Sequence, residues 1–450
     1  MDAVGFARSL SFADLPTEVV EQARRCLLDL VGVAAAGSRA RSARLAAGYA
    51  ADQLGGGTRS ARMLFDGRRA GLAGAAFAGG SAIDAVDAHD GHPLTKGHAG
   101  VAVLPALLAF VDGDPAVRRD GPTFIACLVL GYEIGTRAGI ALHASAADYH
   151  CSGAWNSLAA AAIGVRLLGL DVPRARHAFG IAEYFGPRGQ ILRVCDQPTM
   201  VKDGSGWGAH AGVTAALLAA AGFTGAPALT AESPASRSLW ADLGARWRIL
   251  EQYFKPHPVC RWAQPAIEAA LSLRRAHDIA ADDVVRVRIE SFAEAVALGL
   301  QCPRPGNTDE AQYSITYPVA AALVRGTMGI ADLATETLHS APVVRLMERM
   351  ELVEAPELSR RFPAERYARV RLTMRGGREL VSADTVARGS AENPLDDAEL
   401  AGKYREYAEP VVGVRTATRI AERIAALERS GPVDGLLDDL LRAPAPPGAP

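Results

Sequence analysis

Side chains that carry protons near neutral pH are concentrated in one short stretch of the chain, residues 84–100. This stretch, DAVDAHDGHPLTKGHAG, holds three Asp, one Lys and three of the chain's ten His, with alanine-rich apolar sequence on both sides. Carboxylates and imidazoles act as general acids and bases, and they also bind zinc, iron or manganese. The stretch therefore predicts a site for proton transfer or for a metal ion.

The spacing within the stretch favours convergence on one pocket. Asp87 and Asp90 are three residues apart, as are His89 and His92, so a helix would place the members of each pair on one face. The Pro and Gly that follow would end this helix, and His98 would come after a loop that can fold back. We expect several of these groups to face one cavity.

The residues of this stretch allow three interpretations. A metal site is the first, but the chain has no H-E-x-x-H motif and no Cys/His array, so we expect no metal. A solvated helix end with a capping Asp is the second, and it explains single residues better than the whole cluster. Acid/base chemistry is the third, and it needs no cofactor, because a base removes a proton next to a carboxylate while an acid protonates the leaving group. We favour the third.

Two further segments place a candidate residue just before a helix. His150 precedes a Ser-Gly pair, and a helix N-terminus biases a nearby imidazole toward its neutral form. Cys151 is its neighbour, but adjacent side chains seldom point together, so we do not expect a Cys–His nucleophile. Lys202 lies in a Gly-rich turn, where it and the free N–H groups of a helix start would hold a carboxylate.

Cations and tyrosines gather near an expected domain junction. Lys255 and Arg261 lie on a Pro-stiffened extended segment, and two cations in an interdomain cleft suit an acidic substrate. Tyr313 and Tyr317 are four residues apart at the start of a helix and would share a face. We expect at least one of these tyrosines to be packed in the core.

Periodicity predicts a fold that is mainly α with a smaller α/β domain. Helical patterns rich in Ala and Gly continue from about residue 15 to 273, and such small residues let helices pack closely. After residue 283 the pattern changes, because 283–291 alternates apolar and charged residues and 366–387 predicts two strands joined at a Gly-Gly turn. Helices are predicted at 308–326 and 341–352. The expected parts are a large all-α helical domain over 1–260, an α/β lid domain over 261–392, C-terminal helices over 393–441 that pack back on the helical domain, and a disordered tail at 442–450.

Composition excludes several classes of function. The formal net charge is −2 and charged residues make up 22% of the chain, so we expect no nucleic-acid partner and no membrane partner. The first residues show no basic segment followed by an apolar one, and the six Cys are scattered without a C-x-x-C pair. These features predict a cytoplasmic protein.

The order of the motifs resembles the MmgE/PrpD family. AIDAVDAHDGH with GHAG, YHCSGAWNSLAAAA, VKDGSGWGAHAG, FKPHPVCRWAQP and AQYSITYPVAAAL follow one another as in that family, and the resemblance covers roughly residues 15–427. It implies a homodimer with a cofactor-free site between its two domains, acting on di- or tricarboxylates by acid/base chemistry. The family includes 2-methylcitrate dehydratase, cis-aconitate decarboxylase and an iminodisuccinate epimerase.

Carried over motif by motif, the resemblance implies roles for individual residues. The implied catalytic residues are Asp87, His98, His150 and Tyr317. The expected substrate-binding residues are the lysines matched by the resemblance, Lys202 and Lys255, together with His92 and Arg261.

One departure from the family pattern affects the expected reaction. Family dehydratases and decarboxylases often carry Asp-Asp-Thr where this chain has His89, Asp90 and Gly91, so a Thr hydroxyl is missing. The chain's form of the motif looks more like family members grouped near the epimerase. We expect a dehydratase-type lyase, with an epimerase or isomerase that moves a proton α to a carboxylate as the alternative. A non-catalytic homologue is the third hypothesis.

Overall fold

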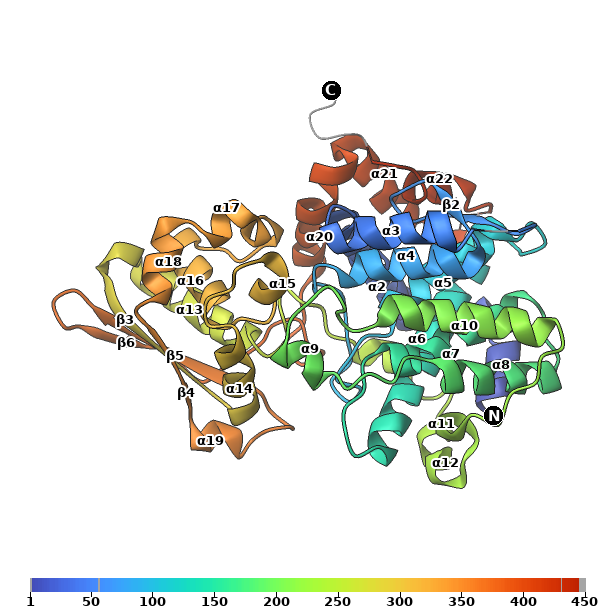
Figure 1. The fold of residues 1–450 in the computed structure, drawn as a ribbon, viewed down its shortest axis with the longest axis horizontal. Helices are drawn as coiled ribbons and strands as arrows, with labels where there is room; N and C mark the ends of the chain where they lie inside the picture. The colour runs from blue at the N-terminus through green and yellow to red at the C-terminus, as the bar shows by residue number, and fades with distance from the viewer. Residues whose placement is uncertain (1, 56, 430, 445–450) are drawn as a thin grey trace.

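The computed structural model describes residues 2–55, 57–429 and 431–444. It has a large helical body and, at one end, a smaller part built on a β-sheet (Figure 1). Of the predicted disordered tail, residues 445–450 lie outside the described residues. The prediction of a mainly α fold with a smaller α/β domain is confirmed.

The helical body is formed by the first half of the chain. Its longer helices are α1 (Ala3–Ser9), α2 (Thr17–Ser38), α3 (Arg41–Gln53), α4 (Leu72–Asp84), α5 (Gly100–Gly113), α6 (Gly121–Ser145), α7 (Gly153–Leu167), α8 (Val172–Phe185) and α10 (Ser205–Ala220). Short elements complete it: β1 (Ala61–Arg62), β2 (Arg69–Ala70), α9 (Leu192–Asp196), α11 (Leu229–Glu232) and α12 (Arg237–Trp240).

Small residues determine how closely the central helices approach one another. Helix α7 packs against α6, α8 and α10. A Cβ on Gly212 of α10 would lie only 2.2 Å from the carbonyl oxygen of Ser157 in α7, so this crossing requires glycine. The Ala- and Gly-rich sequence of these helices thus produces a densely packed core.

Helix α6 is long and apolar enough to cross a membrane, judged by length and composition. However, 94% of its most apolar window is buried inside the fold, where it packs against α2, α5 and α7. This position is typical of a core helix.

The smaller part is built on a mixed sheet with strand order β4-β3-β5-β6, and β7 also pairs with β5. Strand β3 is parallel to β4 and antiparallel to β5. The strands are β3 (Val284–Ser291), β4 (Met350–Glu354), β5 (Tyr367–Met374), β6 (Glu379–Val381) and β7 (Thr385–Val386). The helices of this part are α13 (Gln264–His277), α14 (Ala293–Gln301), α15 (Thr308–Ala311), α16 (Thr316–Arg325), α17 (Thr335–Leu338), α18 (Ala341–Met347) and α19 (Pro356–Ser359).

Two helix predictions in this part are wrong in their extent. The helix predicted over 341–352 ends at Met347, and Met350 begins a strand because it pairs with Val287 of β3. That contact joins residues far apart in sequence, so local periodicity does not reveal it. The helix predicted over 308–326 is interrupted between α15 and α16, and Tyr313 lies in the interruption.

The C-terminal helices lie against the helical body (Figure 1). They are α20 (Asp397–Val412), α21 (Val414–Ala425) and α22 (Asp434–Leu440). Lys403 of α20 donates to the Asp29 carboxylate of α2 over 2.6 Å and to the Ala88 carbonyl over 2.7 Å. Asp29 and Lys403 are both buried, so this ammonium group joins three distant segments inside the core.

Replacing Lys403 by Met tests this connection. The variant should lose about 3–5 kcal/mol of the free energy of unfolding, because it leaves the Asp29 carboxylate buried without its cation. Urea denaturation measures the change. The double variant Asp29→Leu/Lys403→Met should be more stable than Lys403→Met alone, and a single variant as stable as wild type would contradict the prediction.

Candidate active site

A cleft lies where the helical body meets the sheet-bearing part. Its empty volume is about 740 Å³ when the space open to solvent is included. Polar residues from the helical body, from the link after it and from the smaller part line this cleft. They include Asp87, Lys96, His98, Asp203, Tyr253, Lys255, Arg261, Tyr313 and Arg366.

The loop after α4 brings the chemistry-rich stretch to the cleft, and it is not a helix. Helix α4 ends at Asp84, so the predicted helix over the following residues is wrong. Asp87 has a φ of 45°, in the left-handed region that interrupts a helix. Gly91 exchanges backbone hydrogen bonds of 3.0 and 2.7 Å with Tyr253, from a segment far along the chain. This tertiary pairing replaces the local helical pairing that the spacing suggested.

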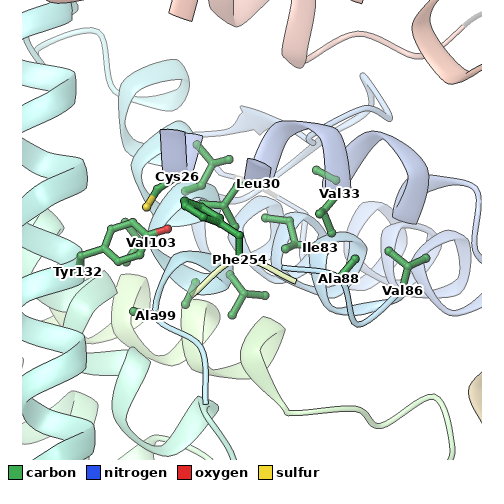
Figure 2. Close-up of a cluster of buried hydrophobic side chains, with 14 of the residues drawn as sticks. Cys26, Leu30, Val33, Ile83, Val86, Ala88, Ala99, Val103, Tyr132 and Phe254 are labelled. Carbon is green, nitrogen blue, oxygen red and sulfur yellow. The ribbon is translucent and has the colours of Figure 1, made fainter. Parts of the chain in front are cut away.

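The segment opposite the loop alternates between core and cleft. Phe254 is 3% exposed, and its ring lies in a cluster of buried side chains that includes Leu30, Ile83 and Val103 (Figure 2). Its neighbours Tyr253 and Lys255 both line the cleft, as expected for an extended segment whose side chains point alternately to opposite sides. The buried phenyl ring therefore fixes the direction of the two polar side chains.

Asp87 and Lys255 form a buried ion pair at the cleft. The Lys255 Nζ lies 2.5 Å from Asp87 Oδ1 and 3.0 Å from the Asp87 carbonyl oxygen. Burial is the largest single effect and lowers the pKa of Lys255, but Asp87, Tyr253 and Cys260 together more than offset it, and the pKa ends above its ordinary value. Lys255 is therefore a charged group in a cleft that holds other cations.

His98 is held as a neutral base. Its Nδ1 contacts the Asp90 carbonyl oxygen, which can only accept, so Nδ1 carries the proton and Nε2 keeps its lone pair. Its backbone N–H donates to Ser152 Oγ over 2.8 Å, and that hydroxyl donates to the Asp203 carboxylate. Burial, and secondly the Lys255 charge, lowers the pKa of His98 to about 4. Nε2 is therefore free to accept a proton at neutral pH.

Buried carboxyl groups surround this histidine. Burial and the nearby Asp87 carboxylate raise the pKa of Asp84 to about 7, and burial also raises the pKa of Asp90 to about 7. Burial and the neighbouring Asp84 raise the pKa of Asp203 well above its ordinary value. These groups can hold protons near neutral pH, beside a histidine that does not.

The structure brings half of the predicted site residues to the cleft. Those that line it are Asp87, His98, Lys255 and Arg261. Arg261 donates to the Arg388 carbonyl oxygen over 2.6 Å, and burial lowers the pKa of Arg261 to about 10, which leaves it charged at neutral pH.

His92 and Tyr317 lie away from the cleft lining. His92 accepts from the Leu94 N–H at Nδ1, so its Nε2–H donates to Glu251 over 3.0 Å. Tyr317 is fully buried, and its hydroxyl donates to the carbonyl oxygen of Asp332. Both side chains already have structural partners, which is the physical reason that they do not reach the cleft.

Lys202 and His150 lie near the cleft without lining it. Lys202 Nζ is 2.6 Å from Asp309 and 2.9 Å from Gln312, and the residue borders a neighbouring hollow. His150 follows the cleft residue Tyr149, and its Nδ1 is buried without a hydrogen-bond partner among the described residues. Burial raises the pKa of the neighbouring Cys151 thiol to about 12, so this thiol stays protonated. The catalytic and binding roles assigned to Lys202 and His150 stay predictions.

Sequence reasoning missed Lys96, Tyr253 and Arg366, and it proposed no site role for Tyr313. Lys96 has a φ of 51°, and its Nζ lies 3.9 Å from the centre of the Tyr149 ring. Arg366 directly precedes β5 and is hundreds of residues along the chain from the loop after α4, which it faces across the cleft. Of these residues, only Tyr253 could have been predicted from the sequence. It is two residues before Lys255 in an extended segment, so both side chains point to the same side of that segment.

One group of side chains at the cleft could hold a metal ion. Asp87, His89 and His98 each offer a ligand atom, and these atoms all lie within 4.8 Å of one another. Two imidazoles and a carboxylate suit zinc or iron, and both ring nitrogens of the buried His89 lack a hydrogen-bond partner among the described residues. The Lys255 ammonium group on Asp87 opposes a second cation there, so this geometry favours proton transfer.

The pKa of His98 predicts a pH dependence of stability. In the unfolded chain this imidazole takes up a proton below about pH 6.5, whereas in the folded chain it does so only near pH 4. Between these values the unfolded state binds more protons, so this group lowers the free energy of unfolding as the pH falls. His98→Gln should remove this decrease in the free energy of unfolding, which is at most about 3 kcal/mol.

Urea denaturation of wild type and His98→Gln at steps from about pH 6.5 to 4.5 measures the difference. Asp84 and Asp90 act with the opposite sign in this range, because their raised pKa values give the folded state more protons. They are present in both proteins, so only the difference between the two curves reports on His98. Parallel curves would show that His98 is not held neutral.

Comparison with known proteins supports the resemblance seen in the sequence. The model of the MmgE/PrpD N-terminal domain matches residues 2–235, and that of the MmgE/PrpD C-terminal domain matches residues 257–429. A cis-aconitate decarboxylase-like protein of Aspergillus oryzae is 26% identical, over 94% of this chain and 93% of its own length. Cis-aconitate decarboxylases of Aspergillus terreus and Homo sapiens are 23% and 25% identical, covering 98% and 83% of this chain and 95% and 80% of their own lengths. The chain belongs to the MmgE/PrpD family.

Proposed function

We propose that this protein is a cofactor-independent acid/base lyase of the dehydratase type, acting on a di- or tricarboxylate. One observation carries the proposal: the neutral His98 has a free Nε2 beside a cleft lined by cations. Lys96, Lys255, Arg261 and Arg366 supply more positive charge than Asp87 offsets, which suits a substrate with more than one carboxylate.

The geometry supports a simple elimination. The cations bind the substrate carboxylates, and His98 Nε2 removes the proton from the carbon next to one of them. The C–H electron pair forms a C=C bond as the bond to the leaving hydroxyl breaks, and that hydroxyl gains a proton and departs as water. Lys255 stabilises the negative charge that develops on the carboxylate during the step.

Two other reactions can use the same groups. The relatives are named cis-aconitate decarboxylases, which favours loss of carbon dioxide in place of water. The missing hydroxyl at Gly91 favours an epimerase, in which two opposed groups exchange one proton across a carbon. Both alternatives keep a base and an anion-binding cleft, so they differ from the proposal in the product.

Incubation of the protein with a panel of di- and tricarboxylates in heavy water, followed by NMR, tests the proposal. A lyase forms an alkene with loss of water or carbon dioxide, whereas an epimerase exchanges the α-proton without losing a fragment. His98→Gln should lower kcat by about two to four orders of magnitude, the range for loss of a general base. Dialysis against a chelator should leave the rate unchanged.

Loss of activity on chelation that zinc or iron restores would contradict the cofactor-independent proposal and assign a metal to Asp87, His89 and His98. An unchanged rate in His98→Gln, with a large loss in His150→Ala, would move the role of base to His150. Turnover of none of the carboxylates would favour the non-catalytic homologue.

We further propose that the protein is a homodimer, as the resemblance implies, and that it is cytoplasmic, as its scattered cysteines suggest. Large apolar side chains are exposed on one region of the helical body, around α3, α10 and the turn before α10. They include Leu45, Tyr49, Val201 and Trp207, with exposed fractions of 56%, 45%, 70% and 47%. An exposed apolar region of this kind is typical of a subunit interface, and a second copy of the chain is the proposed occupant.

Trp207→Glu tests the interface. The charged side chain should prevent the apolar contact, so the variant should elute as a monomer while wild type elutes as a dimer, measured by light scattering after gel filtration. Val285→Glu is a matched control, because Val285 is 52% exposed on β3, in the sheet-bearing part and away from α3 and α10. A monomeric wild type would contradict the prediction.

A further inference from the structure

The space beside Gly91 is filled by a tyrosine hydroxyl. A Cβ built on Gly91 would lie 2.5 Å from Tyr253 Oη and 2.6 Å from Tyr253 Cζ, and 2.8 Å from His98 Nδ1. The backbone of Gly91 is not among those with a positive φ, so the close neighbours, and not the backbone conformation, exclude a side chain here. The Tyr253 hydroxyl therefore lies in the space that a side chain at position 91 would fill.

Tyr253 is held firmly, yet its hydroxyl has no hydrogen-bond partner in the described part of the chain. Two backbone hydrogen bonds fix it to Gly91, and the Arg261 guanidinium lies 4.5 Å from its ring centre. The ring is nearly perpendicular to that of His98, with centres 6.4 Å apart. Tyr253 lines the cleft, and no described residue makes a hydrogen bond with its hydroxyl. A fixed, unpartnered donor in a cleft is available to a ligand.

We propose that Tyr253 is the proton donor of this site, working opposite His98 as the base. This inference rests on the proposed lyase function. As His98 Nε2 takes the α-proton and the C=C bond forms, the bond from carbon to the leaving hydroxyl breaks. That oxygen takes the Tyr253 proton and leaves as water. The phenolate is then reprotonated through solvent, and His98 gives up the proton that it gained, so protons and electrons balance.

The charges around Tyr253 fit this role. Burial raises the pKa of Tyr253, so the phenol keeps its proton at neutral pH until the leaving oxygen needs it. Lys255 and Arg261 oppose that rise and would stabilise the phenolate as it forms. Gly91 leaves room for the hydroxyl beside the base.

Tyr253→Phe tests the proposal, because it removes one oxygen and keeps the ring that packs against Arg261 and His98. We expect kcat to fall by about two to four orders of magnitude, with KM changed by less than about threefold. Tyr407→Phe is a matched control: its hydroxyl is also buried and has no hydrogen-bond partner among the residues that the structure describes, but the residue lies on α20 outside the cleft. The control should keep the wild-type rate, and circular dichroism should show all variants folded.

A substrate analogue with fluoride in place of the leaving hydroxyl separates proton donation from a structural role. Fluoride needs less help from an acid, so the loss caused by Tyr253→Phe should shrink at least about tenfold on the analogue. The loss caused by His98→Gln should persist, because the α-proton must still be removed.

An equal loss in Tyr253→Phe on both substrates would reduce Tyr253 to a packing role and overturn the proposal. A kcat within threefold of wild type would overturn it as well, and the lyase function would stand. Absence of wild-type turnover on every carboxylate would overturn the lyase function and Tyr253 together.

Discussion

The contact between Lys255 and Asp87 is the interaction on which the site depends. It joins the loop after α4 to the link that follows the helical body, over a Nζ–Oδ1 distance of 2.5 Å. A buried ammonium group is stable only with a partner, so each residue holds the other in the cleft. The Lys255 charge also adds to burial, the larger effect, in lowering the pKa of His98 and keeping that imidazole neutral.

Placing these charges in the interior is costly, and the surrounding fold offsets the cost with polar contacts. Lys403 binds the Ala88 carbonyl, one residue after Asp87, and so supports the loop from the side of the C-terminal helices. Ser152 links the His98 backbone to Asp203. The left-handed backbone at Asp87 is strained for a non-glycine residue, and it persists because these contacts fix both of its sides. Strain of this kind is concentrated at functional sites.

The sequence predicted the fold class and part of the site, for physical reasons that differ between residues. Helical periodicity is local, so the succession of helices in the first half of the chain is predicted correctly. The strand from Met350 and the bridge from Gly91 to Tyr253 depend on distant partners, and no local pattern encodes them. Asp87 does line the cleft, but the helix spacing from which convergence was predicted is absent from the structure.

The cleft residues that were not predicted show a second limit of inference from local sequence patterns. Arg366 and Tyr313 reach the cleft from the smaller part, through the packing of one part of the fold on the other. Tyr253 could have been predicted from the sequence. In an extended segment whose Phe254 side chain lies in the core, the side chains of Tyr253 and Lys255 must point to the opposite side. Tyr253 was nevertheless not predicted as a site residue.

The two parts of the fold contribute different residues to the cleft, and this has a consequence for substrate specificity. The base and the Asp87–Lys255 pair come from the helical body and the link, whereas Arg366 comes from the sheet-bearing part. Under the proposed mechanism, the groups that act on the reacting carbon are thus fixed in the larger core, and the smaller part carries a cation that would bind a remote carboxylate. Substitutions in the smaller part can therefore change which polycarboxylate binds without displacing the base. A fold with this division could host sites of different specificity on one core.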